Sequence, residues 1–231
     1  DFTSWEGGPG LEGKRIGGSD LWLAETTLPM DARANYKIVL DGQDWILDPA
    51  NPLVQPGGLG DNNILAMPEF TITTDTARRS DVAHGTLSDD LAIESQNLGY
   101  AVNYRVYTPA GYEELSGLPV VYVTDGNDWV DEPYGAMAVV LDNLIADGRI
   151  EPVMAVFIDA REPGNPQNNR REQEFLDHSE AYARFVAEEL VPAVDHAYRT
   201  DASAGARVIQ GTSYGAVIAT WPLETSRHGR P

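Results

Sequence analysis

The pattern of hydrophobic positions changes between the two halves of the chain. In the second half, apolar runs at 101–108, 119–124, 153–158 and 208–210 predict strands, because strands buried on both faces carry few polar side chains. Between these runs, apolar residues recur at three- and four-residue spacing, which predicts two core-packed helices. The first is formed by Met137, Val140, Leu141, Leu144 and Ile145, and the second by Tyr182, Phe185, Val186, Leu190 and Val194.

The helix boundaries carry their own signals. We expect Gly148 to end the first helix, and Asp177 with Glu180 to cap the start of the second. Alternating strands and helices predict a mainly parallel sheet covered on both faces, with its chemistry at the carboxyl ends of the strands.

In the first half of the chain, the apolar runs are shorter. Short β-like runs at 21–23, 35–40 and 45–47 are punctuated by turn residues, which favours a small antiparallel sheet or sandwich. We expect a loop at 57–63 and a polar connector at 71–90. The predicted organisation is a β-sandwich-like domain at 1–75, a linker and entry segment at 76–96, and an α/β domain at 97–231.

Composition narrows the classes of partner. With 36 acidic and 16 basic residues, the formal charge of −20 disfavours nucleic acid and anionic membranes. It favours neutral or cationic substrates, although the same charge also serves solubility alone. No apolar run approaches the roughly 18 residues of a membrane span. The chain has no cysteine, which excludes disulfides and thiolate catalysis, and its first residues, 1–5, indicate a processed or truncated end.

One motif carries specific chemistry. Gly211-Thr212-Ser213-Tyr214-Gly215 follows a short apolar run and precedes a helix-compatible segment. Gly-x-Ser-x-Gly in this context is typical of a nucleophile elbow, in which small residues allow a sharp strand-to-helix turn and the serine adopts a strained backbone conformation. A chance turn or a helix cap is the alternative. If the elbow is real, Ser213 is the nucleophile and the backbone N–H of Tyr214 is an oxyanion donor.

Two loops are candidates for the rest of the site. The segment after the buried strand at 119–124 offers Gly126 as the oxyanion loop, with Asn127 and Trp129 against the substrate; the alternative is an ordinary turn with a core tryptophan. Arg161 and Arg171 flank a loop at the carboxyl end of another strand. They are candidates for binding substrate, or for ion pairs that brace the loop.

The histidines do not complete a triad. His228 alone follows the serine, and we expect it at a solvated helix end, whereas His178 is at best a supporting residue. No histidines fall at metal-ligand spacing, so no metal or cofactor is expected.

These motifs together resemble the enterochelin-esterase-like branch of the α/β-hydrolases, which includes esterase D-like and feruloyl or acetyl-xylan-type esterases. The resemblance covers nearly the whole chain. It is carried by Leu21-Trp22, Tyr36-Lys37, Asp48-Pro49, Asn63, Met67-Pro68, Val106-Tyr107, Asp125-Gly126, Leu141-Asp142-Asn143-Leu144-Ile145, Arg171-x-x-Glu174-Phe175 and Glu188-Glu189-Leu190.

The resemblance implies an immunoglobulin-like domain followed by an α/β-hydrolase domain that hydrolyses small-molecule or carbohydrate esters through an acyl-enzyme on Ser213. It also implies a triad aspartate and histidine that follow the serine, so we expect this chain to be a fragment, incomplete at its C-terminus and inactive as it stands. The alternative is a non-catalytic ligand- or carbohydrate-binding protein with an esterase-like fold, in which Trp22, Tyr36 and Trp45 could contact sugar.

Overall fold

The computed structural model describes residues 10–57 and 60–220. It forms two compact units, Asp1–Thr73 and Thr74–Pro231. The division falls beside the predicted end of the first domain at residue 75. The two units are described separately.

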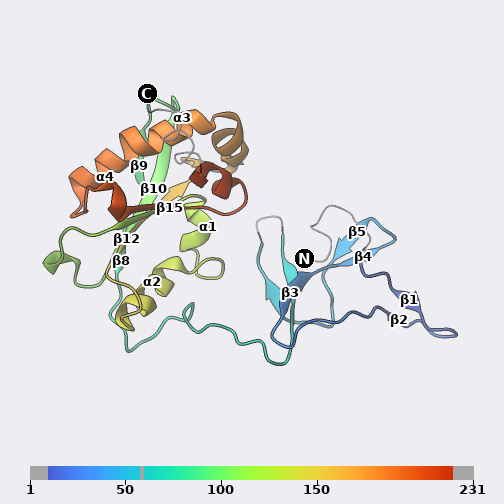
Figure 1. Ribbon diagram of the computed structural model, residues 1–231. Helices are drawn as coiled ribbons and strands as arrows, with labels where there is room; N and C mark the ends of the chain where they lie inside the picture. Colours follow the sequence, from blue (N-terminus) through green and yellow to red (C-terminus); the bar gives the residue numbers. More distant parts are fainter. Residues whose placement is uncertain (1–9, 58–59, 221–231) are drawn as a thin grey trace, which may run out of the picture. The chain divides into compact units, whose positions relative to one another are not determined.

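The second unit is built on a six-stranded sheet (Figure 1). Its strands are β8 (Thr86–Leu87), β9 (Leu91–Glu94), β10 (Ala101–Thr108), β11 (Val120–Val123), β12 (Met154–Asp159) and β15 (Arg207–Gln210). The order is β15-β11-β12-β10-β8, and β9 also pairs with β10. Strand β11 runs parallel to β12 and β15, whereas β10 is antiparallel to β12, β8 and β9. The sheet is therefore mixed rather than mainly parallel, because the short connection between β9 and β10 allows only antiparallel pairing.

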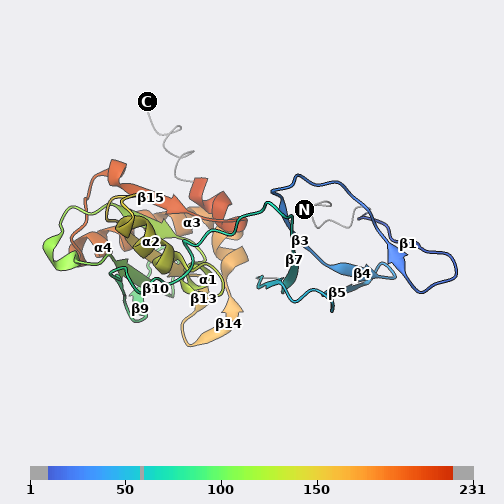
Figure 2. The ribbon, with the colours of Figure 1, turned by 90° about the horizontal axis from the view of Figure 1, so that it is seen from below.

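Helices cover both faces of this sheet, as predicted. Helix α2 (Met137–Ala146) lies on one face and stands in front of the sheet in Figure 2. The opposite face carries η2 (Gln173–Asp177), α3 (Ser179–Arg184), η3 (Phe185–Leu190) and α4 (Val191–Ala197), of which α3 and α4 are labelled in Figure 1. The shorter elements are η1 (Tyr112–Glu114), α1 (Gly126–Val130), η4 (Ala204–Ala206) and the hairpin of β13 (Arg161–Glu162) and β14 (Asn165–Asn169).

Both predicted helices are present, but one predicted boundary is wrong. Gly148 follows α2 with a φ of 65°, which suits a helix stop. Asp177, in contrast, lies inside η2, and α3 begins without any side-chain cap. The helical segment already starts at residue 171, because the apolar face extends back to the fully buried Phe175.

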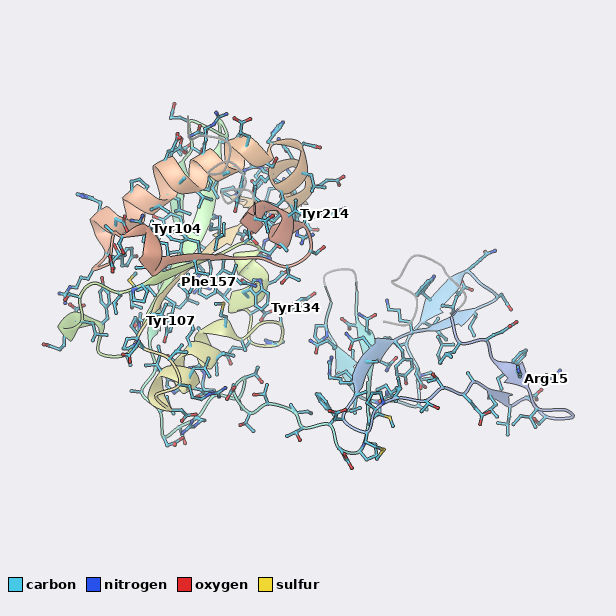
Figure 3. All side chains as sticks on the ribbon, viewed as in Figure 1. Arg15, Tyr104, Tyr107, Tyr134, Phe157 and Tyr214 are labelled. Atoms are coloured by element: carbon cyan, nitrogen blue, oxygen red, sulfur yellow. The ribbon has the colours of Figure 1, made fainter. Side chains whose placement is uncertain are left out.

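Alternate residues of the central strands divide the core into two layers. Met154, Val156 and Ile158 of β12 pack with the helices at 173–197, and Ala155 and Phe157 pack towards α2. The same alternation places Tyr104 and Tyr107 of β10 on opposite sides of the sheet (Figure 3). The two-residue period of a strand thus fixes which face each side chain covers.

The first unit is entirely antiparallel. It contains β1 (Lys14–Arg15) with β2 (Trp22–Leu23), the three strands β3 (Arg33–Tyr36), β7 (Asn62–Ala66) and β6 (Val54–Gln55), and the hairpin β4 (Ile38–Leu40) with β5 (Asp44–Ile46). The single strand predicted at 35–40 is wrong, because the run is divided at Lys37 between two sheets. The loop predicted at 57–63 ends early, since β7 begins at Asn62.

Polar contacts organise this unit. Between residues 10 and 73, in the part that the structure describes, no hydrophobic side chain is fully buried, and the buried residue is Asn63. Its Oδ1 accepts from the backbone N–H of Asp48 at 2.6 Å, and its Nδ2 donates to the carbonyl of Asn51 at 2.9 Å. The hydroxyl of Tyr36 donates to the Asp48 carboxylate at 2.7 Å. Hydrogen bonds therefore join the strands and loops of this unit, a role that a buried apolar core has in the second unit.

The connector predicted at 71–90 is more ordered than expected, since it includes β8 and is fixed to α2. Buried Asn143 donates from Nδ2 to the carbonyls of Asp75 and Ala77. Buried Asp142 accepts from the Gly85 backbone N–H at 2.7 Å and from the hydroxyl of Tyr107 at 2.8 Å. Among the described residues, none of the helices combines the length and the apolar character that a membrane crossing requires.

Candidate active site

The structure forms a sharp turn at the predicted elbow. Strand β15 ends at Gln210, residues 214–220 are helical, and Ser213 lies between them with a φ of 57°. This left-handed conformation is uncommon for a residue other than glycine and is typical of a constrained functional turn. Ser213 is exposed, and its hydroxyl has no hydrogen-bond partner within residues 10–57 and 60–220. Tyr214, labelled in Figure 3, begins the helix.

The two glycines of the motif are required by packing. A Cβ at Gly211 would overlap the carbonyl of Gly215 and lie 2.7 Å from Oγ1 of Thr124. A Cβ at Gly215 would overlap the same threonine and lie 3.1 Å from Oδ2 of Asp125. Any larger residue at either position would separate the elbow from the end of β11.

A second turn of the same kind follows β11. Asp125 has a φ of 54°, and Gly126 is the first residue of α1. Gly126 is buried so closely against β12 that a Cβ would overlap the backbone of Phe157. Gly126 and Tyr214 each begin a helical segment, so their backbone N–H groups have no acceptor in a preceding turn; their predicted role as oxyanion donors stays a prediction.

Arg171 joins these two turns. Its Nε donates to Oδ1 of Asp125 at 2.7 Å, and its Nη2 donates to the carbonyl of Thr212 at 3.1 Å. The guanidinium carbon also lies 5.2 Å from the centre of the Tyr214 ring. These contacts support the alternative role of Arg171, in which it braces the loop through an ion pair. Its predicted contact with substrate stays a prediction.

Arg161 is held differently. It forms a two-point ion pair with Asp159, with Nη2 to Oδ2 at 2.7 Å and Nε to Oδ1 at 2.9 Å. Burial raises the pKa of the Asp128 carboxyl, and the charges of Arg161 and Arg171 oppose that increase. Burial likewise raises the pKa of Asp125, against the hydrogen bond and charge of Arg171.

The other predicted loop residues are turned towards the protein. Nδ2 of Asn127 donates to Oδ1 of Asp128 at 2.7 Å, and Trp129 is half-buried against the layer that contains α2. Their roles towards a substrate stay predictions. Sequence reasoning missed Asp125 and Thr124 as the residues that fit the two turns together. The available signal was an Asp-Gly pair directly after a buried strand.

The histidines in the described part of the chain do not reach the serine. His178 is exposed at the end of η2, and Nδ1 of His84 lies 3.1 Å from Oδ2 of Asp142. His228, the histidine that follows Ser213, lies outside the described residues. Within the described ranges, no three His, Asp or Glu side chains converge as a set of metal ligands.

A mixed sheet between helices, with a strand-to-helix turn that holds a left-handed serine, defines an α/β-hydrolase-like fold. The family model "Esterase: Putative esterase" matches residues 95–226, which is more than half of the chain. The chain belongs to this esterase family. It is also 28% identical over 149 residues to an endo-1,4-beta-xylanase/feruloyl esterase of Xylanibacter ruminicola, a match that covers 61% of this chain and 20% of that protein.

Solved structures agree in fold. The ferric enterobactin esterase of Salmonella typhimurium superimposes with a TM-score of 0.68 at 19% identity, over 95% of this chain and 60% of that one. A ferulic acid esterase of Anaeromyces mucronatus gives a TM-score of 0.53 at 18% identity, over 65% of this chain and 58% of that one. The match therefore spans a fifth of this curated relative and about three-fifths of these structures.

Proposed function

We propose that the protein is a serine carboxylic-ester hydrolase in which Ser213 forms an acyl-enzyme. The observation that carries this proposal is the left-handed, exposed serine at the end of β15, directly before a helix. Attack by its hydroxyl on an ester carbonyl would create an oxyanion, which the N–H groups of Tyr214 and Gly126 would stabilise. Membership of the esterase family supports this reaction.

A triad also needs a base and an acid. We assign both to chain outside the described residues, because Ser213 has no histidine partner within them. On this proposal, the described residues supply the nucleophile and the oxyanion donors. The serine itself is exposed and therefore accessible to a base from elsewhere in the chain.

The substrate class follows from charge around the turns. Asp125, Asp128 and Asp159 interact electrostatically with Arg161 and Arg171, so the three carboxylates outnumber the two guanidinium groups. This balance and the charge of −20 disfavour a polyanionic substrate. We propose a neutral small-molecule or carbohydrate ester, with Asn127, Trp129 and Arg161 nearest the substrate. The similar proteins include a xylanase/feruloyl esterase and a ferulic acid esterase, which is consistent with this class.

The test is labelling by a fluorophosphonate probe, which reacts with activated serines. The 231-residue chain and the complete product of its gene are both treated, with Ser213→Ala as the control. Labelling that disappears in Ser213→Ala, together with turnover of an aryl ester, supports the proposal. Labelling at another residue, or none in either protein, contradicts it.

A second candidate function rests on exposed tryptophans. Trp22 and Trp45 of the first unit are 68% and 47% exposed, whereas core aromatic residues would be buried. Such rings can stack on sugars, so we propose carbohydrate binding by this unit as the alternative, whether or not it has an immunoglobulin-like fold. Trp22→Ala and Trp45→Ala would then weaken binding to xylan fragments while leaving ester turnover unchanged.

A further inference from the structure

One arginine side chain connects the backbone of both helix-starting turns. Arg171 binds the carboxylate of Asp125 at 2.7 Å and the carbonyl of Thr212 at 3.1 Å. Asp125 immediately precedes Gly126, and Thr212 immediately precedes Ser213. A planar guanidinium therefore bridges the residues that come just before the two groups proposed to act on the ester.

The sheet itself does not connect these turns. The pairing of β11 with β15 ends at Val123 and Gln210, and the last ladder bond runs from the Thr124 N–H to the Gln210 carbonyl at 3.0 Å. Beyond this point, the hydrogen bonds that join the two turns in the described part of the chain pass through Arg171. Without it, beyond the ladder the two turns would be joined only by the close packing of Thr124 and Asp125 against Gly211 and Gly215.

The Asp125 carboxylate does not cap α1, although its position at the start of that helix predicts this role. Asp125 occupies the N-cap position of α1, where an aspartate side chain commonly accepts from the helix N–H groups, yet it forms no cap hydrogen bond. It bonds Arg171 instead and keeps a left-handed backbone, with a φ of 54°. The first N–H groups of α1 are thereby left available.

Two aromatic rings lie near the guanidinium of Arg171. Its guanidinium carbon lies 5.2 Å from the centre of the Tyr214 ring and 5.9 Å from that of Phe175. Tyr214 follows the nucleophile directly, and Phe175 is fully buried in the core. These ring contacts add to the two hydrogen bonds that hold the guanidinium between the turns.

We propose that Arg171 and Asp125 are positioning residues that set the separation and direction of the two oxyanion donors, the N–H groups of Gly126 and Tyr214. This inference rests on the proposed ester hydrolysis. Two donors stabilise a developing oxyanion only when both point at it, and a displacement of about 1 Å at a reacting centre costs roughly 100-fold in rate. The pair acts on the transition state, because the oxyanion forms only there.

The test compares Arg171→Gln, Arg171→Lys and Asp125→Asn with Arg184→Gln, which removes an exposed ion pair with Glu180 further along the same helical segment. The complete gene product is assayed with a p-nitrophenyl ester for kcat and KM, and with an alkylboronic acid, which mimics the tetrahedral state. We expect Arg171→Gln and Asp125→Asn to lower kcat by about 10- to 100-fold with KM within about twofold. Affinity for the boronic acid should fall in parallel, and Arg184→Gln should match the wild type.

Two further results are expected from a pair that acts as a unit. The double variant Arg171→Gln/Asp125→Asn should lose no more kcat than the worse single variant, because interacting residues are not additive. Arg171→Lys should recover part of the loss. Hydrogen exchange at the amides of 126 and 214–216 should be faster in Arg171→Gln than in Arg184→Gln, and this readout does not depend on activity.

The contrary outcomes are distinct. A higher KM with unchanged kcat would mean that Arg171 contacts the substrate. Unchanged kcat with unchanged amide exchange would mean that the bridge stabilises the turns without influencing the donors. Either result overturns the inference. If Arg171→Gln does not fold, the comparison of Asp125→Asn with Arg171→Lys decides in the same way. Turnover that survives in Ser213→Ala would contradict the proposed function itself. If Ser213→Ala is inactive and Arg171→Gln is fully active, only this inference is contradicted.

Discussion

Asp125 and Ser213 share a left-handed backbone conformation, with φ of 54° and 57°, at the carboxyl ends of the neighbouring parallel strands β11 and β15. Each stands one residue before the start of a helix. Such conformations cost about 1–3 kcal/mol for residues other than glycine, so they persist only where the surroundings enforce them. The same constrained backbone conformation therefore begins a helix at the ends of two neighbouring strands.

The small residues of the elbow should tolerate no side chain. Gly215→Ala would place a methyl group against Thr124 and Asp125, and Gly211→Ala would place one against the carbonyl of Gly215. We expect each to lower the free energy of unfolding by about 1–3 kcal/mol, as overpacking does, and to reduce labelling of Ser213 at least about tenfold. Thermal denaturation and fluorophosphonate labelling measure the two effects.

Gly205→Ala is the matched control, because nothing lies within 4 Å of its Cβ position and its φ is not positive. It should change neither quantity. If Gly215→Ala labelled as fast as Gly205→Ala, the close packing of the elbow would be irrelevant to its chemistry.

Asp142 should be important for the stability of the second unit. Its buried carboxylate accepts from the Gly85 N–H and the Tyr107 hydroxyl, and both donors would lose their partner in Asp142→Ala. Leaving buried polar groups unpaired costs about 1–3 kcal/mol for each group, so we expect a loss of at least about 2 kcal/mol in unfolding free energy. Urea denaturation measures it. Asp81→Ala, which removes an exposed partner of Arg79, should leave the free energy of unfolding almost unchanged, and equal losses would disprove the special role of Asp142.

The sequence predicted the parts of the fold that depend on periodicity. The strand at β12 and the apolar face from Tyr182 to Val194 were recognisable because full burial leaves a continuous or helical apolar pattern. The sharp turn at 211–215 was recognisable because close packing there requires glycine at 211 and 215. Local chemistry sets these features, so a single sequence contains them.

Other features depend on contacts between distant segments. The break at Lys37 follows from pairing with β7 and β5, which the run at 35–40 does not encode by itself. The bridge from Arg171 to Asp125 spans 46 residues of sequence, and the local sequence around either residue does not predict the pairing. The sequence therefore indicated candidate groups, and only the topology paired them.

Asn63 should hold the first unit together. Its side-chain amide binds the backbone of Asp48 and Asn51, in a unit with no buried apolar side chain among its described residues. We expect Asn63→Ala to expose this unit to limited proteolysis while the second unit remains protected, because the lost bonds have no apolar core to compensate for them. Asn62→Ala is the neighbouring control, since its Nδ2 makes a single long bond of 3.5 Å to the Gly60 carbonyl. Similar cleavage of the two variants would show that Asn63 is not the anchor.

Glu174 should make the stability of the second unit depend on pH. Its carboxyl is 1% exposed, the Tyr100 hydroxyl donates to Oε1 at 3.2 Å, and Oε2 has no hydrogen-bond partner among the described residues. Burial raises the pKa of Glu174 to about 8, against the Tyr100 hydrogen bond and the charge of Arg170, while the carboxylates of Asp159 and Asp125 raise it further.

The direction of the effect follows from proton binding. The unfolded chain releases this proton near the ordinary pKa of 4.5, whereas the folded protein keeps it until about pH 8. Folding therefore takes up a proton between these values, and stability falls as pH rises from about 4.5 to about 8. Glu174→Gln removes this dependence. The difference in unfolding free energy between Glu174→Gln and the wild type should therefore increase, in favour of the variant, by about 1.4 kcal/mol per pH unit across that window. Urea denaturation of Glu174→Gln from pH 5 to 9, with the exposed Glu172→Gln as control, measures the difference. Parallel curves for Glu174→Gln and wild type would mean that the buried carboxyl is ionised throughout, and the control should remain parallel in either case.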